Sequence, residues 1–223
     1  MTNNKSTVLK HGFTLAEVLI TLVIIGVVAA MTIPTTISKY QEQERKTRIK
    51  KTYSTLSNAF MRSKADKGDF VLDNFDEDSI ADWYNTYLKP YLITVKTCYN
   101  GAAGCWGGYT KFLRGGNCHY SDGRGIGSPR INAILSDGTY VNFDVYNGPD
   151  VLAKFKVQTD SFAVVVIFDI NGEKEPNTFG KDTFAVIYTK NGFVPSYKDA
   201  SSSDINYDCS DAGTGYSCIM KYL

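Results

Sequence analysis

The sequence predicts an α+β protein in which a long N-terminal helix, membrane-spanning in its first half and amphipathic in its second half, packs on an antiparallel β-sheet head domain. Three observations support this class. An apolar run covers residues 13–33, a charged segment with helical spacing of apolar residues follows over 34–66, and several β-type runs separated by turn residues lie within 67–223. We therefore divide the chain into residues 1–12, 13–33, 34–66 and the head domain, 67–223.

The apolar run is long enough to cross a bilayer as a helix. From Phe13 to Ile33 there are 21 residues, among which Glu17 alone is charged. At about 1.5 Å per residue this helix rises about 31 Å, which matches the roughly 30 Å hydrocarbon core. A carboxylate in such a segment costs about 2.5 kcal/mol or more in lipid, so Glu17 needs a partner. We interpret the segment as an assembly device rather than a plain anchor.

The start of this run carries a family signature. Gly12, Phe13, Thr14, Leu15 and Glu17, with the apolar residues after them, resemble the N-terminus of type IV pilins and of the pseudopilins of type II secretion systems. The resemblance implies that a membrane peptidase cleaves between Gly12 and Phe13 and methylates the new amine of Phe13. Residues 1–12 are then a cleaved leader peptide, and Glu17 becomes the fifth residue of the mature chain.

The resemblance also gives Glu17 and Pro34 a role in assembly. The free amine of Phe13 would lie one turn from Glu17 in its own helix, or beside Glu17 of a neighbouring subunit. Such a pair interacts more strongly in an apolar environment than in water, although desolvation reduces the net gain. Pro34 occupies the position where family members carry a helix-kinking proline. Because it has no N–H and its ring clashes with the preceding turn, it can kink or locally melt the helix.

The function implied is that of a prepilin-like subunit, polymerised through its N-terminal helix into a type IV pilus or a type II secretion-type pseudopilus. Its partners would be prepilin peptidase, other pilin or pseudopilin subunits, the inner-membrane assembly machinery and the membrane. Lys5 and Lys10 precede the span, so the positive-inside rule places the leader in the cytoplasm and the head domain outside, later in an extracellular or periplasmic filament. The alternative is an uncleaved, monomeric, membrane-tethered binding protein.

The helix is expected to continue to about residue 66 and to pack on the head domain. Ile49, Tyr53, Leu56 and Phe60 follow one another at intervals of four, three and four residues, which places them on one face. Gly68, with Asp69 after it, marks the helix end. The charged segment 41–51 is either solvated or paired with neighbouring subunits, and the sequence leaves both interpretations open.

Further elements are predicted in the head domain. A second helix is expected over residues 80–88, with Ser79 as its N-cap and Pro90 ending it. The glycine-rich residues 101–129 indicate a long loop pinned by cysteines. Strands are expected over residues 131–135 and 139–145, joined by an Asp-Gly turn, and over 162–170 and 183–189.

Five cysteines follow the apolar run, and an external compartment permits disulfides between them. Cys209 and Cys218 close a short C-terminal loop, so we pair them, and type IV pilins carry a similar C-terminal disulfide loop. One more bond is expected among the other three, but the sequence does not select the pair. A zinc site with His119 is disfavoured because the cysteine spacings match no common finger. The remaining three cysteines are Cys98, Cys105 and Cys118.

Residues 169–182 concentrate side-chain oxygens of the kind that calcium prefers, and calcium takes about six to eight of them. Major pseudopilins are similar in holding calcium in a loop beside the sheet, although their ligands do not align with this segment. It is not an EF-hand, because Lys174 and Gly180 stand where that loop needs glycine and glutamate. The alternative is a polar connection between two strands. The candidate ligands are Asp169, Asn171, Glu173, Glu175, Asn177 and Asp182.

The remaining sequence features argue against two function classes. There is no Walker loop, HExxH or GxSxG motif, and the only histidines are His11 and His119, so we expect no enzymatic activity. The formal charge is +1, and removal of Lys5 and Lys10 with the leader would leave 22 basic against 23 acidic residues. This balance predicts no bulk attraction to nucleic acid.

Overall fold

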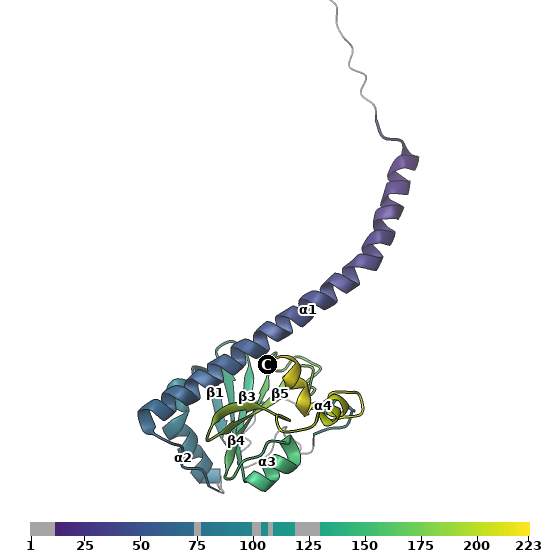
Figure 1. The fold of residues 1–223 in the computed structure, drawn as a ribbon. Helices are drawn as coiled ribbons and strands as arrows, with labels where there is room; N and C mark the ends of the chain where they lie inside the picture. Colours follow the sequence, from purple (N-terminus) through teal and green to yellow (C-terminus); the bar gives the residue numbers. More distant parts are fainter. Residues whose placement is uncertain (1–11, 74–76, 100–103, 107–108, 119–129) are drawn as a thin grey trace, which may run out of the picture. The chain divides into compact units, whose positions relative to one another are not determined.

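The computed structural model describes residues 12–73, 77–99, 104–106, 109–118 and 130–223. Two compact units are present, Met1–Glu44 and Arg45–Leu223, and we call the second the head. Helix α1 (Leu15–Lys67) contributes its first part to the first unit and its second part to the head (Figure 1). It ends just before Gly68, which has a φ of +83° and donates its N–H to the carbonyl of Lys64. The predicted helix end is therefore confirmed.

The head contains one six-stranded antiparallel sheet in which neighbours in sequence are neighbours in space. The four predicted strands correspond to β2, β3, β4 and β5, and the Asp-Gly turn joins the first two as expected. The sheet and the long helix confirm the α+β class. In order, the strands are β1 (Thr94–Tyr99), β2 (Ile131–Leu135), β3 (Tyr140–Tyr146), β4 (Ala163–Asp169), β5 (Thr183–Thr189) and β6 (Gly192–Pro195).

Both faces of this sheet are covered, which explains why every residue of β4 and β5 is buried. Alternate side chains of a strand point to opposite faces. Val164 and Val166 accordingly join one core with α1 and α2 (Glu77–Tyr87), whereas Val165 and Ile167 join a second core with α3 (Gly148–Phe155) and the segment after β6. That segment includes α4 (Ser202–Asp208) and the 3₁₀ helix η2 (Tyr216–Lys221).

The second part of α1 packs on the head through the predicted stripe. Ile49, Leu56 and Phe60 are fully buried, and Tyr53 is half-buried and donates its hydroxyl to the carbonyl of Phe193 at 3.2 Å. The Phe60 ring lies at the centre of an aromatic cluster. Its centroid is 4.5–6.4 Å from those of Phe70, Phe143, Tyr188 and Phe193.

The limits of α2 differ from those predicted. The helix begins at Glu77, so Ser79 lies inside it and the prediction of Ser79 as the N-cap is wrong. The helix ends at Tyr87, and Pro90 lies within a short 3₁₀ helix, η1 (Lys89–Tyr91). Proline is accepted there because the first residues of a helix need no N–H donor.

Candidate functional site

The start of α1 forms the candidate assembly site. Thr14 precedes the first helical residue, Leu15, and both its N–H and its hydroxyl donate to Glu17 Oε2, at 2.8 and 2.9 Å. In return, the Glu17 N–H donates to Thr14 Oγ1 at 3.3 Å. This reciprocal arrangement is a capping box, and it satisfies N–H groups that a helix N-terminus leaves without intrahelical partners. Glu17 therefore has a partner within its own chain before any other subunit is considered.

Gly12 and Phe13 lie directly before this capped turn. Neither is helical, and the Phe13 side chain is 89% exposed. A protease needs an accessible backbone outside regular secondary structure at the bond that it cleaves, and the Gly12–Phe13 peptide bond lies in non-helical, exposed backbone. Cleavage at this bond would place a new amine one residue before Thr14, and thus within reach of the carboxylate that Thr14 contacts.

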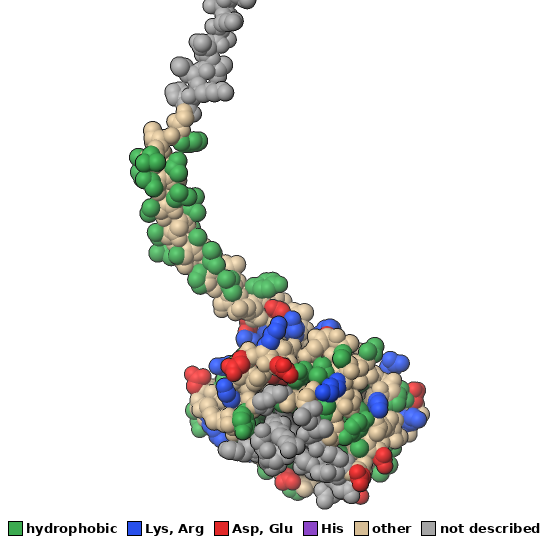
Figure 2. Space-filling model, turned by 180° about the vertical axis from the view of Figure 1, so that it is seen from behind, with side chains coloured by type: hydrophobic (Ala, Val, Ile, Leu, Met, Phe, Trp, Pro, Cys, Tyr) green, Lys and Arg blue, Asp and Glu red, His purple; other side chains and the backbone are tan. Residues whose placement is uncertain are grey.

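The large apolar side chains of α1 between Leu15 and Ile33 are exposed, and Figure 2 shows hydrophobic side chains along the side of the helix that it displays. Ile20, Val23 and Ile25 point in different directions and are each at least 60% exposed. By length and composition the helix can cross a membrane, with a mean hydropathy of 2.5 over its most apolar window. Exposed apolar surface of this extent is typical of a segment whose surroundings are lipid or other helices.

Helix α1 continues unbroken through Pro34. Three threonine hydroxyls bond back to helix carbonyls around it: Thr32 to Val28 at 2.9 Å, and Thr35 and Thr36 to Thr32 at 2.8 and 3.0 Å. Such back-bonding satisfies hydroxyls that would otherwise be unpaired in an apolar environment, and it favours bending of the helix. The helix is not melted at Pro34 in this structure.

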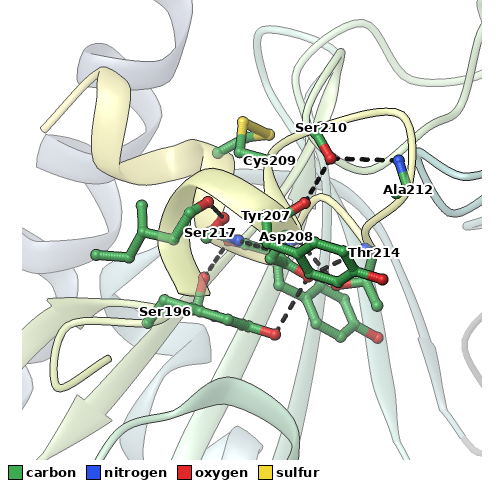
Figure 3. Close-up of a disulfide and its surroundings, with 12 residues drawn as sticks. Ser196, Tyr207, Asp208, Cys209, Ser210, Ala212, Thr214 and Ser217 are labelled. Carbon is green, nitrogen blue, oxygen red and sulfur yellow. Dashed lines mark hydrogen bonds between the residues drawn. A yellow bond between two sulfur atoms is a disulfide. The ribbon is translucent and has the colours of Figure 1, made fainter. Parts of the chain in front are cut away.

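The C-terminal segment of the head is held by a disulfide between Cys209 and Cys218, the pair expected from the sequence (Figure 3). Beside it, the buried Asp208 accepts hydrogen bonds from the Tyr197 hydroxyl at 3.2 Å and from the backbone N–H groups of Thr214 and Ser217 at 3.0 and 2.7 Å. The disulfide and these hydrogen bonds therefore hold the loop between Cys209 and Cys218. The 3₁₀ helix η2, which contains Cys218, contributes side chains to both cores of the head.

The second disulfide joins Cys98, at the end of β1, to Cys105, and this selects one pair from the three cysteines left open by the sequence. Cys118 is the free thiol and is buried, with its Sγ 3.8 Å from the Tyr216 hydroxyl. Burial raises the pKa of the Cys118 thiol to about 12. His119, considered with it for zinc, lies outside the described residues. Among the described residues no group of three His, Cys, Asp or Glu side chains could hold a metal.

Of the six predicted calcium ligands, the structure brings four together in the β4–β5 connection. Asn171 donates its N–H to Asp169 Oδ1 at 3.0 Å, while Asp182 Oδ2 accepts from the Asn171 amide at 3.3 Å and the Asn177 N–H at 2.8 Å. Burial, and then the nearby Asp182 carboxylate, raises the pKa of Asp169 to about 7. The other two predicted ligands are exposed: Glu173, which is beside Tyr140, and Glu175.

The face of the head seen in Figure 2 carries Lys and Arg side chains interspersed with Asp and Glu. Ion pairs between described residues also join opposite charges, such as Lys51 with Asp137 and Lys190 with Asp160. Proteins that attract nucleic acid through charge usually gather Lys and Arg into one patch or stripe. This face therefore offers no support for a nucleic-acid interface.

Two comparisons bear on these features. Residues 9–33 match the model of the prokaryotic N-terminal methylation motif, so the start of the chain is a type IV pilin-like prepilin segment. Residues 35–105 match a family of unknown function, DUF6613. No curated protein and no solved structure matches the chain. The prepilin motif implies processing by prepilin peptidase and assembly with other pilin subunits, and with the apolar helix it fits an inner-membrane-anchored protein with an external head.

Sequence reasoning missed the partner of Glu17 within its own chain. The sequence Thr14-x-x-Glu17 has the spacing of a capping box and could have shown it. Sequence reasoning also missed the hydrogen bonds of Asp208. No short motif predicts them, because the fold brings Tyr197 and Ser217 to Asp208.

Proposed function

We propose that the chain is a prepilin-like subunit that is cleaved after Gly12, N-methylated at Phe13 and polymerised through its N-terminal helix into a type IV pilus or a type II secretion-type pseudopilus. Insertion leaves the leader in the cytoplasm and the head outside the membrane. Prepilin peptidase, other pilin or pseudopilin subunits and the inner-membrane assembly machinery are its partners.

One observation carries this proposal. Glu17 is a carboxylate in the first turn of a helix whose other side chains to Ile33 are uncharged, and it is the fifth residue after the bond to be cleaved. Before cleavage the capping box with Thr14 satisfies it. After cleavage, the Phe13 amine of a neighbouring subunit is a stronger partner because it carries a full positive charge. Exchange of one partner for the other would hold an incoming subunit at a defined axial position.

Processing is tested by the intact mass of the chain after coexpression with prepilin peptidase. The expected product begins at Phe13 and is heavier by one methyl group. Gly12→Val in the same host is the control, and it should remain at full length because the bulky side chain blocks the cleavage site. A wild-type chain that also keeps its leader would contradict the proposal and favour the uncleaved tethered protein.

Assembly is tested separately with Glu17→Gln and Glu17→Ala in the native host. Both should be processed and inserted normally, yet both should lose most filament incorporation, measured by shearing filaments and quantifying the subunit. The glutamine variant isolates the effect of the charge, because it keeps side-chain length and one acceptor while removing the charge. A wild-type level of incorporation for Glu17→Gln would show that the carboxylate does not act through its charge.

A further inference from the structure

Two stretches of the head carry opposite charges of equal size. Residues 45–51, where α1 enters the head, contain five basic and no acidic residues. Residues 73–82, which lead into α2 and form its first half, contain five acidic and no basic residues. Like charges on neighbouring turns of a helix repel, so neither stretch stabilises its own helix through charge pairs.

Each stretch presents two like charges four residues apart on an exposed helix face. On α1 these are Lys46 and Lys50, which we call the lysine face, and on α2 they are Asp78 and Asp82, the aspartate face. In both cases the spacing places the two side chains about 5–6 Å apart. None of the four forms an ion pair with another residue that the structure describes. The dipole of α2 favours Asp78 in the first turn, but Asp82 lies one turn further on and gains little from it.

The lysine face lies at the end of the sheet where β4 ends. Arg48, between the two lysines, donates to the carbonyl of Ile170 directly after β4, at 3.2 Å. Lys51 forms an ion pair with Asp137 at 2.8 Å, and Asp137 is in the β2–β3 turn, which lies at the same end of the antiparallel sheet. Because both contacts come from the same two turns of α1, they hold the lysine face at this end of the head.

The acidic stretch begins at the opposite end of the sheet. The residues just before Asp73, 69–72, line one cavity with Ser161 and Phe162, which directly precede β4. Strand β4 has seven residues and spans about 23 Å. Salt at physiological concentration screens charges over about 8 Å, so the two ends have little attraction for each other within one subunit.

Asp82 is also far from the lysine face. Its neighbour Trp83 contacts the ring of Phe70, which in turn contacts Phe60, with centroids 6.0 and 5.5 Å apart. Phe60 lies about 15 Å further along α1 than Lys50. The lysine face and the aspartate face therefore do not meet within one subunit, and each is open to another molecule.

We propose that the lysine face of one subunit binds the aspartate face of a second copy of the chain. The pairs are Lys46 and Lys50 with Asp78 and Asp82 of the next subunit. This inference rests on the proposed polymerisation and names the surfaces of the heads that meet in it. The equal spacing allows both pairs to form at once when the two helices lie side by side. Because the two surfaces differ, each added subunit brings a new free face, and repetition of the contact extends the assembly.

A second copy fits the lysine face better than a phosphate-bearing partner does. Anionic lipid or nucleic acid would satisfy the lysines but would leave the matching aspartate face without a partner. The lysine face also continues the helix that carries the prepilin segment, so subunits that join through this helix bring their heads together. Exposed ion pairs add little affinity singly and act mainly on steering and register. The contact therefore selects which surfaces meet.

Zero-length cross-linking of the wild-type chain tests the contact directly. A carbodiimide joins a lysine amine to a carboxylate only where the two groups already touch. In sheared filaments we expect covalent dimers in which a peptide of the lysine face is linked to a peptide of the aspartate face, identified by mass spectrometry. Because the faces do not meet within one subunit, this product joins two copies. Dimers in which Lys46 and Lys50 are linked only to other carboxylates would overturn the proposal.

Charge reversal tests the pairing by rescue. Reversal of the lysine face, Lys46→Glu with Lys50→Glu, should lower incorporation into filaments at least about fivefold. Reversal of the aspartate face, Asp78→Lys with Asp82→Lys, should do the same. All four substitutions together should restore incorporation to within about twofold of wild type. Loss without rescue, in chains that keep the wild-type urea midpoint, would show that the faces do not pair.

The matched controls are Lys181→Glu and Asp211→Lys, because both residues are exposed and lie outside the two faces. Each should keep wild-type incorporation. Loss of incorporation in the lysine-face variant alone would assign that face to a phosphate-bearing partner and overturn the proposal. The proposed function fails differently: a processed wild-type chain that forms no filaments contradicts polymerisation itself. Normal filaments from both face-reversal variants contradict only the contact between the faces.

Discussion

The two parts of helix α1 place the same kind of apolar side chain in opposite environments. In the first unit, Ile20 and Ile25 are 60% and 63% exposed, whereas in the head Ile49 and Leu56 are fully buried. Burial of apolar surface contributes about 25 cal/mol per Å², so the head is stabilised by its own chain. The first part of the helix gains this energy only from lipid or from other subunits. One helix therefore combines a segment that completes a fold with a segment that needs an assembly.

The largest effect is expected where α1 completes the head. Phe60→Ala removes a fully buried ring from the aromatic cluster and should lower the free energy of unfolding by about 3–5 kcal/mol. The control is Met61→Ala on the same turn, which is 57% exposed and should cost no more than about 0.5 kcal/mol. Urea unfolding followed by tryptophan fluorescence measures both. Equal effects would show that this part of α1 does not complete the core.

A smaller effect is expected from the C-terminal disulfide. Replacing both Cys209 and Cys218 by serine frees a loop with a sequence separation of 9 and should cost about 2–3 kcal/mol in unfolding free energy. Most of the loss would come from the greater freedom of the unfolded chain. Asp208→Asn is the companion variant, because it disturbs the adjacent hydrogen bonds while leaving the disulfide intact. If the double serine variant unfolds at the wild-type urea concentration, the Asp208 network alone holds this loop.

In the exposed part of α1, local contacts should contribute less. Thr14→Val removes the hydroxyl of the capping box and should destabilise the first turn of the helix by about 1 kcal/mol. Thr14→Ser keeps the hydroxyl and is the control. Amide hydrogen exchange of residues 15–18 in detergent micelles measures the difference, and the valine variant should exchange about fivefold faster. Equal rates in the two variants would show that Thr14 does not cap the helix.

The elements that could be predicted are those whose periodicity spans many residues or whose turn has a local code. Helix α1 has such a periodicity, the Asp-Gly turn marks β2 and β3, and continuous apolar runs mark β4 and β5. The resemblance at Gly12–Glu17 is carried by adjacent residues. Strand β1 was missed because Cys98 alone among its residues is buried, so it has no apolar run, and β6 because it has four residues. The choice of Cys98 with Cys105 depends on how β1 places its end. Which of the oxygen ligands predicted over residues 169–182 lie together depends on how the β4–β5 connection folds, and the sequence does not show this.

The smallest effect is expected for alkylation of Cys118, because burial of its thiol should prevent the reaction in the native chain. Alkylation requires the thiolate, and an ordinary thiol has a pKa of about 8.5. Because burial raises the pKa of Cys118 to about 12, its thiolate is more than about 1,000-fold scarcer at pH 8.5. Iodoacetamide should therefore leave the native chain unmodified and add one group in urea, as intact mass would show.

The same shift has a defined effect on stability. The native state holds the Cys118 proton more tightly than the unfolded chain does, so this contribution is complete below about pH 8.5 and is lost as the pH rises toward 12. Tyr84, whose pKa burial also raises to about 12, acts in the same direction from about pH 10. The urea midpoint of the head should thus fall between pH 9 and 11. Rapid alkylation of the native chain at pH 8.5 would instead show that the Cys118 thiol is accessible to solvent, as the side chains in the first part of α1 are.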